Sequence, residues 1–445
     1  MAKGPGRNAP CPCGSGRKYK NCCLPADEAR ERAGRGVASA ASTVSVWDAP
    51  DDELIDDYDG DVEDDLDPNG TPLLTPDDPL VAAQNALWER FAAADYETQI
   101  ALFQEALRGT MLDADLAFEM LGQIETAARD HGELGRFAAL VEQYAREQPA
   151  VYQEDAVHYA SWVIESALES GDLGRIPAAL EPFARDPAGG LGELFRVADQ
   201  LLYYDQTALL LDTLRRGWQP LSRASGINPD AVYDYADLLT ELTVLEYARA
   251  AAAPHADAAH LASQIAPYCD ADDIQAVQQN AVALLGRLGR QWQARDFESP
   301  PRTEPRERRL GLLAHEWAGD AWRQRGVPLG RATLAAQALA EFLIEGAAKG
   351  KSAQTLLVPA RRRLDRFLTE HFDILDYREY RAGALVELLP LYLDFLVRRG
   401  LVNGGVARRA LAELRPLQND LVRSLTADHA DAALVAAIRE RWASE

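Results

Sequence analysis

The 445-residue chain contains no apolar run of the roughly 18 residues that a membrane-spanning helix needs. It also lacks an N-terminal apolar stretch of the kind that directs secretion. We therefore expect a protein without a membrane span that resides in a reducing cytoplasm. The net charge of −24 at pH 7 disfavours binding of nucleic acid along the whole chain.

Alternating runs of β-branched residues are also absent, so the sequence gives little indication of strands. From Pro79 onward, apolar residues instead recur at helical spacing. Two clear examples are Leu134, Phe137, Leu140, Val141 and Tyr144, and later Leu334, Ala338, Leu339 and Phe342. Gly, Pro and Asp residues interrupt this pattern at regular intervals. The sequence thus predicts an all-α body of helices joined by short turns.

Recognisable catalytic motifs are missing from this body. There is no nucleophile elbow and no evident Cys–His or Ser–His–Asp order, although such triads are spatial and can be hidden in a sequence. Gly350-Lys351-Ser352 resembles the end of a phosphate-binding loop, but Glu345 stands where that loop needs its first glycine. We predict a turn between helices there, and we expect that the protein is not an enzyme.

Cysteine is scarce, and four of the five cysteines fall within thirteen positions: Cys11, Cys13, Cys22 and Cys23. Four thiolates can fill the tetrahedral shell of a structural Zn²⁺ ion, which leaves no open position for water. Disulfides and free thiols are the alternatives, but a bond between the adjacent Cys22 and Cys23 would be strained. We predict that these four cysteines bind zinc. The fifth, Cys269, lies in an apolar helical region and is expected to be a buried small hydrophobe.

The cysteine-rich segment resembles the SEC-C motif, the zinc-binding tail of the bacterial preprotein translocase ATPase SecA. The positions that match the motif are Asn8, Pro10, Cys11, Cys13, Gly14, Ser15, Gly16, Lys18, Tyr19, Lys20, Cys22 and Cys23. The resemblance implies a zinc-stabilised docking element, which engages a chaperone in the translocase and is associated with ribosomes in related tails. It covers only a small part of the chain. Because no ATPase motor is recognisable in the rest, the translocase activity does not carry over.

Charge is distributed unevenly along the first part of the chain. Residues 1–36 hold eight Lys and Arg against three acids, whereas residues 48–78 hold fourteen acids and no Lys or Arg. A run of like charges resists collapse. The resemblance places a SEC-C zinc-binding motif at 1–25, and the run of acids predicts a disordered acidic linker at 26–78. In this part of the chain, a contact with nucleic acid is expected only through the basic N-terminal segment.

A weak internal repeat occurs in the helical part. Gly132–Glu147 aligns with Gly171–Asp186 at an offset of 39 residues, and Arg136 aligns with Arg175. Repeats of this length with two helices per unit are typical of tetratricopeptide-like or HEAT-like solenoids. Pro177 and Pro182 should disturb the second copy.

A Pro-rich charged segment predicts a connector at 298–309, between an α-helical repeat-like lobe at 79–297 and a second α-helical lobe at 310–445. A long loop within one continuous superhelix is the alternative. On the helices themselves, we expect His158 to be a packed or rim histidine near Trp162. Arg361–Arg363 is either a solvated helix face or a contact for phosphate or RNA.

Together these features predict a zinc-binding adaptor or scaffold. The SEC-C knuckle would dock on a protein partner such as a ribosome or a secretion chaperone, and a helical-hairpin, solenoid-like body would bind a protein or peptide. The alternative is an enzyme whose site lies between helices of the second lobe, with the knuckle as an accessory recruiter. A deep pocket with converging polar groups and perturbed pKa values would favour the enzyme.

Overall fold

The protein is described by a computed structural model over 79–109, 111–251, 258–298, 305–347, 352–370, 378–427 and 431–443. Regular structure in these ranges is entirely helical, with no strand, which confirms the all-α prediction. The chain divides into two compact units, 1–59 and 60–445, and all of the described helices belong to the second. The predicted SEC-C motif at 1–25 and linker at 26–78 lie outside the described residues.

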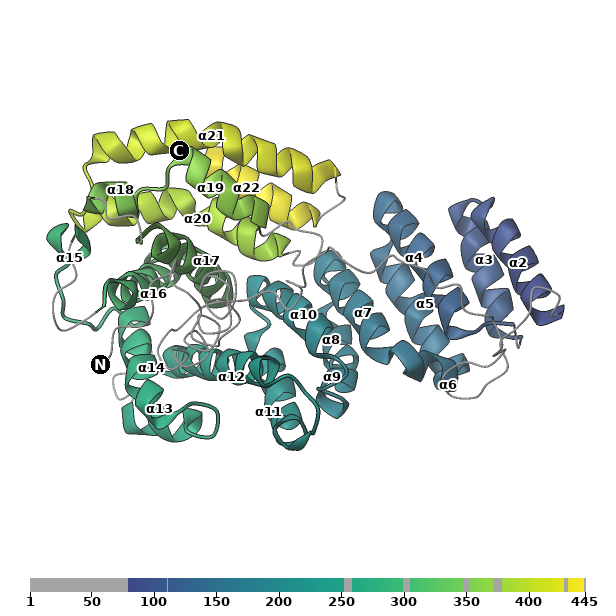
Figure 1. The fold of residues 1–445 in the computed structure, drawn as a ribbon. Coiled ribbons are helices and arrows are strands. Elements are labelled where there is room, and N and C mark those ends of the chain that lie inside the picture. The colour runs from purple at the N-terminus through teal and green to yellow at the C-terminus, as the bar shows by residue number, and fades with distance from the viewer. Residues whose placement is uncertain are drawn as a thin grey trace, which may run out of the picture. The chain divides into compact units, whose positions relative to one another are not determined.

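The first helices follow one another in chain order (Figure 1). They are α2 (Pro79–Ala92), α3 (Tyr96–Leu107), α4 (Ala114–His131), α5 (Leu134–Glu147), α6 (Pro149–Tyr152), α7 (Ala156–Ser170), α8 (Ile176–Ala179), α9 (Glu181–Arg185), α10 (Leu191–Tyr203) and α11 (Thr207–Arg223). Contacts run mainly between near neighbours: α2 with α3 and α4, α4 with α5, α5 with α7, α7 with α10, and α9 with α11.

Local sequence signals define the ends of these helices. The carboxylates of Asp95 and Asp113 cap α3 and α4, each accepting a hydrogen bond of 2.9 Å from a backbone N–H of the first turn. Gly132 and Gly171 end α4 and α7 in the left-handed region, with φ of 68° and 77°. The apolar residues predicted to share one face of α5 are all buried, as are those predicted for residues 334–342.

The two copies of the internal repeat fold differently. Gly132–Glu147 forms one continuous helix, α5, after its capping glycine. Gly171–Asp186 is broken into a 3-10 turn at Leu173–Arg175 followed by the short helices α8 and α9. Pro177 and Pro182 stand in the first turns of α8 and α9, where a missing N–H is tolerated. The predicted disturbance of the second copy is confirmed.

The aligned arginines of the two copies nevertheless make equivalent contacts. Arg136 pairs with Glu133 at 3.0 Å and with Glu97 of α3 at 2.6 Å. Arg175 pairs in the same way with the acid three residues before it, at 2.7 Å, and with Glu142 of α5 at 2.6 Å. Each arginine therefore links its own turn to the helix pair that precedes it. A solenoid requires such contacts, and the solenoid itself stays a prediction.

The remaining helices form a second set: α12 (Pro229–Ala250), α13 (Ala258–Ile265), α14 (Ala271–Leu284), α15 (Arg295–Glu298), α16 (Arg306–Arg325), α17 (Leu329–Ala347), α18 (Ala353–Leu357), α19 (Arg361–Glu370), α20 (Glu379–Arg398), α21 (Gly404–Ala427) and α22 (Ala432–Ala443). Here α16 packs on α14 and α17, and α20 packs on α10, α16, α17, α21 and α22. Fifteen of the twenty residues of α20 are buried, so this helix is covered on all sides.

Two glycines allow unusually close packing of this second set. A Cβ atom on Gly319 of α16 would lie 1.8 Å from the carbonyl oxygen of Leu284, at the end of α14. A Cβ atom on Gly330 of α17 would lie 2.3 Å from the carbonyl oxygen of Leu202 in α10. Both separations are far below any real contact, so the helices approach with backbone against backbone.

The predicted connector at 298–309 contains the start of a helix, because α16 begins at Arg306. Residues 299–304 lie outside the described ranges. Helix α10 contacts α17 and α20, so helices of the lobes predicted at 79–297 and 310–445 touch each other. The division into two lobes stays a prediction.

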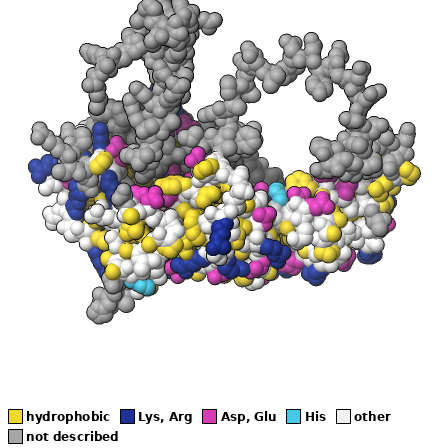
Figure 2. All heavy atoms as spheres, turned by 60° about the horizontal axis from the view of Figure 1, so that its bottom comes forward, with side chains coloured by type: hydrophobic (Ala, Val, Ile, Leu, Met, Phe, Trp, Pro, Cys, Tyr) yellow, Lys and Arg dark blue, Asp and Glu magenta, His cyan; other side chains and the backbone are white. Residues whose placement is uncertain are grey.

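Cys269 was expected to be buried, but it is half-exposed in the bend between α13 and α14. On the face shown in Figure 2, hydrophobic side chains are interspersed with charged ones. Among the described helices, none combines the length and the apolar content that crossing a bilayer requires.

Candidate functional site

The predicted zinc ligands Cys11, Cys13, Cys22 and Cys23 lie outside the described residues, so their assignment stays a prediction. Within the described ranges, no group of three or more His, Cys, Asp or Glu side chains is placed to hold a metal ion. The chemistry that the structure does show lies on α4, α7 and α10.

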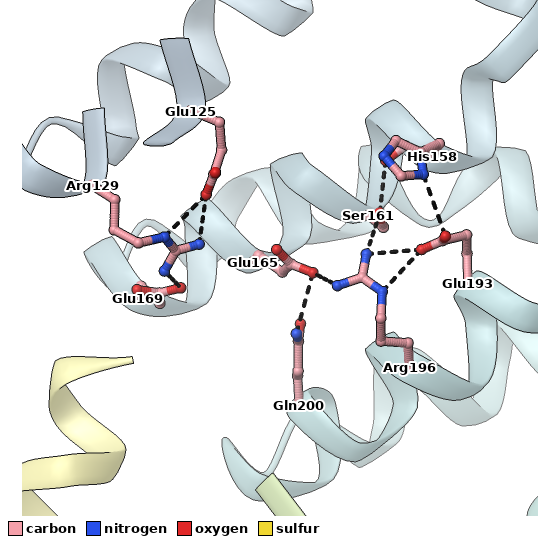
Figure 3. Close-up of polar contacts among 9 residues, drawn as sticks. All are labelled: Glu125, Arg129, His158, Ser161, Glu165, Glu169, Glu193, Arg196 and Gln200. Carbon is pink, nitrogen blue, oxygen red and sulfur yellow. Dashed lines mark hydrogen bonds and ion pairs between the residues drawn. The ribbon is translucent and has the colours of Figure 1, made fainter. Parts of the chain in front are cut away.

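Nine side chains form a polar cluster across these three helices (Figure 3). Its members are Glu125, Arg129, His158, Ser161, Glu165, Glu169, Glu193, Arg196 and Gln200. On each helix they recur at spacings of three or four residues, which places them on a single face. We call this set the polar cluster.

Arg129 of α4 is held between two carboxylates of different helices. Its guanidinium donates to Glu125 one turn earlier, at 2.6 Å, and also binds Glu169 of α7. Burial raises the pKa of Glu169 to about 7, although the charge of Arg129 acts in the opposite direction. The pair therefore fastens α4 to α7 through a carboxyl group that titrates near neutrality.

Arg196 of α10 makes the corresponding bridge to α7. It donates to Glu193 on its own helix at 2.8 Å, to the Ser161 hydroxyl at 2.8 Å, and to Glu165. Burial disfavours ionisation of Glu193, but hydrogen bonds from His158 and the charge of Arg196 outweigh it and lower the pKa of this carboxyl to about 2. Glu193 therefore stays ionised at physiological pH.

The first turn of α20 adds a further acid beside the polar cluster. Burial, reinforced by the negative charge of Glu165, raises the pKa of Glu379 to about 8. The arginines Arg129 and Arg196 act in the opposite direction. Near its C-terminal end, α10 also meets the second set of helices: Tyr203 donates to Glu387 of α20 at 2.9 Å, and Tyr204 donates to Asp431 at 2.5 Å.

Aromatic side chains adjoin the polar cluster on its α4 side. Phe118 stacks on Trp162 with ring centroids 5.3 Å apart, and the His158 ring lies 4.8 Å from Phe118 and 4.7 Å from Trp162. Phe118 remains 38% exposed, which makes it one of few large hydrophobic side chains of the described residues that face solvent. The expectation that His158 is a packed or rim histidine is confirmed.

An open groove of about 550 Å³ begins at Phe118 and runs between α2 and α4. The residues that line it are Trp88, Gln99, Phe118, Glu119, Gly122, Gln123, Thr126, Ala127 and Asp130. Gly122 lies beside Trp162, where a Cβ atom would make only an ordinary contact of 3.9 Å. The groove and the aromatic cluster are thus parts of one surface.

The polar cluster links helices α4, α7 and α10 through ion pairs, and its geometry does not provide an activated nucleophile. The Ser161 hydroxyl donates to the backbone carbonyl of His158 at 2.7 Å and accepts from Arg196. The His158 ring contacts Glu193, at 3.3 Å, and makes no hydrogen bond with that hydroxyl. Nε2 of His158, the ring nitrogen that would act as a general base, makes no hydrogen bond with Ser161, so this hydroxyl is not activated.

His158 and Trp162 could be recognised in the sequence as neighbours on one helix, whereas the polar cluster and the groove could not be predicted from it. A usable signal was present on α7, where Glu165 and Glu169 continue the helical spacing of His158 and Trp162. That pattern shows only that the four residues share a face. The partners of that face come from α4 and α10, and their proximity appears only in the folded chain.

Comparison with known proteins identifies one short segment. Residues 7–25 match the SEC-C motif. The match includes all four cysteines of the predicted zinc site, so the resemblance to this family is confirmed for the segment. The chain is 90% identical over 19 residues to protein translocase subunit SecA of Prosthecochloris aestuarii. It is also 90% identical over 19 residues to a UPF0225 protein of Sodalis glossinidius. The uncharacterised protein YecA of Escherichia coli is 80% identical over 20 residues.

These similarities cover 4% of the present chain and 2%, 12% and 9% of the three relatives. The chain thus spans only a small fraction of the length of the curated relatives it matches. No solved structure matches the chain. The comparisons support the SEC-C segment and leave the helical body without an assigned family.

Proposed function

We propose that this protein is a zinc-binding adaptor. The SEC-C segment docks on one macromolecule, and the helical body binds a protein or peptide. The observation that carries this proposal is the SEC-C match at 7–25 in a chain whose described remainder is built from packed helices. The same motif occurs in a translocase subunit and in proteins of other kinds, as expected for an appended module.

Zinc is the cofactor that we propose for Cys11, Cys13, Cys22 and Cys23. Four thiolates form a closed shell, and a closed shell ties local folding to the metal. Zinc would thereby order the segment for docking. We propose a ribosome or a secretion chaperone in the cytoplasm as the class of partner, because these are the partners that the SEC-C resemblance implies.

The open groove favours binding over catalysis for the helical body, whereas the shifted pKa values of Glu169 and Glu379 are a feature that the enzyme alternative also predicts. The groove is open and lies on α2 and α4, whereas the enzyme alternative requires a deep site between helices of the second lobe. The arginines of the polar cluster are already bound to carboxylates. We therefore propose a binding protein rather than an enzyme.

The zinc assignment is tested on the full chain by measuring bound metal. We expect about one zinc ion per chain, as a single closed Cys₄ site requires. The double variant Cys11→Ser, Cys13→Ser should lose the metal, and Cys269→Ser, the matched control, should keep it. Metal retained by the double variant would refute the assignment.

The docking role is tested by affinity capture from a native lysate with the same two variants. We expect ribosomal proteins or a secretion chaperone to be captured by the wild-type chain and by Cys269→Ser, and to be lost from the Cys11→Ser, Cys13→Ser variant. An identical partner list from all three would place docking on the helical body alone, and failure of every form to capture a macromolecule would refute the adaptor.

A further inference from the structure

The chemistry of the surface around Phe118 distinguishes one class of partner for the helical body. Phe118 presents an exposed ring that rests on Trp162, and Trp162 in turn lies 5.9 Å from the buried ring of Phe137. This stack is supported from below by the core of α5. An incoming apolar side chain would therefore meet a preorganised aromatic face, which costs little conformational entropy on binding.

The groove beside this face provides length along α4. Phe118 and Trp88 contribute aromatic rings to its lining, and Gly122 adds no side chain between them and the polar residues. Gln99, Gln123 and other polar side chains also line the groove, which suits a bound peptide backbone that needs hydrogen-bond partners. The groove thus has the mixture of apolar and polar lining that an extended segment requires.

Helix α4, which supplies most of the groove lining, is acidic. It holds four Asp and Glu residues and one arginine, a net charge of −3, whereas α5, α8, α9 and α11 sum to +2. The arginine, Arg129, is bound by Glu125 and Glu169 of the polar cluster. Glu119 and Asp130 line the groove itself. The groove therefore carries negative charge beside the exposed aromatic ring.

We propose that the face formed by Phe118, Trp162 and the α2–α4 groove binds a cationic peptide segment that carries an aromatic or long aliphatic anchor. The anchor packs on Phe118, and a Lys or Arg side chain beside it meets the exposed carboxylate of Glu119. A cation close to the Phe118 or Trp88 ring gains a further attraction. Acidic peptides and RNA are repelled by the same charges. This inference rests on the proposed binding role of the helical body and names its partner chemistry.

The test uses the full chain and two short fluorescein-labelled peptides in fluorescence anisotropy. The first contains Lys, Leu and a single Trp, and the second has every Lys replaced by Glu. We expect only the Lys peptide to bind, and more weakly as salt is raised. Equal or tighter binding of the Glu peptide, or of a single-stranded RNA of similar length, would overturn the assigned chemistry.

Variants locate the binding to this face. Phe118→Ala should weaken binding of the Lys peptide by about tenfold, since it removes the anchor site. The double variant Glu119→Lys, Gln123→Lys should weaken it by a similar factor without removing any aromatic ring. Tyr233→Ala, which removes an exposed aromatic side chain on α12, is the matched control and should bind as the wild type does. Circular dichroism establishes that each variant is folded.

Binding that is unchanged in both groove variants would refute the inference about this face. Such a result would leave the adaptor proposal standing if the lysate capture still depends on Cys11 and Cys13. Conversely, peptide binding lost in the groove variants would support the surface even if the SEC-C segment captured no partner. The two proposals can therefore fail separately.

Discussion

The helices from α2 to α11 and those from α12 to α22 are held together by different kinds of contact. In the first set, amphipathic helices bury one face, and arginines such as Arg136 and Arg175 link each turn to the helix pair before it. In the second set, α20 is buried on all sides and glycines bring backbones together. The ion pairs of Arg136 and Arg175 in the first set are therefore partly solvated, whereas the contacts of α20 and of Gly319 in the second set exclude water.

This difference predicts where single substitutions will matter. A partly exposed ion pair is screened by water, and its loss exposes two charged groups that water can solvate again. When the partner of a buried charge is removed, or when two closely packed backbones are forced apart, water cannot offset the loss in this way. The variants below test this contrast on the full chain, beginning with the largest expected effect.

Arg381 of α20 is a largely buried charge that links α20 to two other helices. Its guanidinium pairs with Glu341 of α17 at 3.0 Å and with Asp199 of α10 at 3.4 Å. We expect Arg381→Leu to lower the free energy of unfolding by about 3–5 kcal/mol, because it leaves the buried carboxylate of Asp199 without its cation. Chemical denaturation measures this loss. A decrease below about 1 kcal/mol would show that the pairs are solvated, contrary to the comparison.

A substitution at Gly319 tests the close packing of the α16 backbone against the end of α14. Gly319→Ala places a methyl group on the carbonyl of Leu284 and should cost about 2–3 kcal/mol by forcing the helices apart. Gly311→Ala, on the same helix with open space around the position, is the control and should stabilise the protein by about 0.5–1 kcal/mol. Equal effects of the two changes would contradict the close packing.

Glu379 provides a pH-dependent test where α20 meets the first set. The folded-state pKa of Glu379 is raised to about 8, so its contribution to stability is present below the ordinary carboxyl pKa and is lost as the pH rises through 8. Glu379→Gln mimics the protonated form. We expect its Tm to equal that of the wild type near pH 5 and to exceed it by a few degrees at pH 9. Glu119→Gln, on the exposed part of α4, should show no such divergence in Tm.

Arg136 should give the smallest effect, because its bridge to Glu97 is largely exposed. We expect Arg136→Ala to change the Tm by no more than about 2 °C, and this difference should shrink further in high salt. A loss comparable to that of Arg381→Leu would mean that the surface arginines hold the first set together and would reverse the comparison.

The same contrast explains how much of the fold and the site could be predicted. The buried face of α5 and the break at Pro177 depend on residues close in sequence, so periodicity and proline chemistry were sufficient. The four cysteines could be recognised because all four predicted zinc ligands lie close together in the sequence. The carboxylates around Arg381 come from α10 and α17, and the partners of α7 in the polar cluster come from α4 and α10. No pattern within a single helix records which distant helix will face it.

The hydrogen bond between Tyr203 and Glu387 joins residues that are 184 positions apart. At translation rates of about 5–20 residues per second, a nascent chain needs roughly 10–40 s to extend from the first residue to the second. During that interval the C-terminal end of α10 has left the ribosome without the helix that will cover it. The order of synthesis therefore leaves the C-terminal end of α10 uncovered in an unfinished chain until α20 has been made.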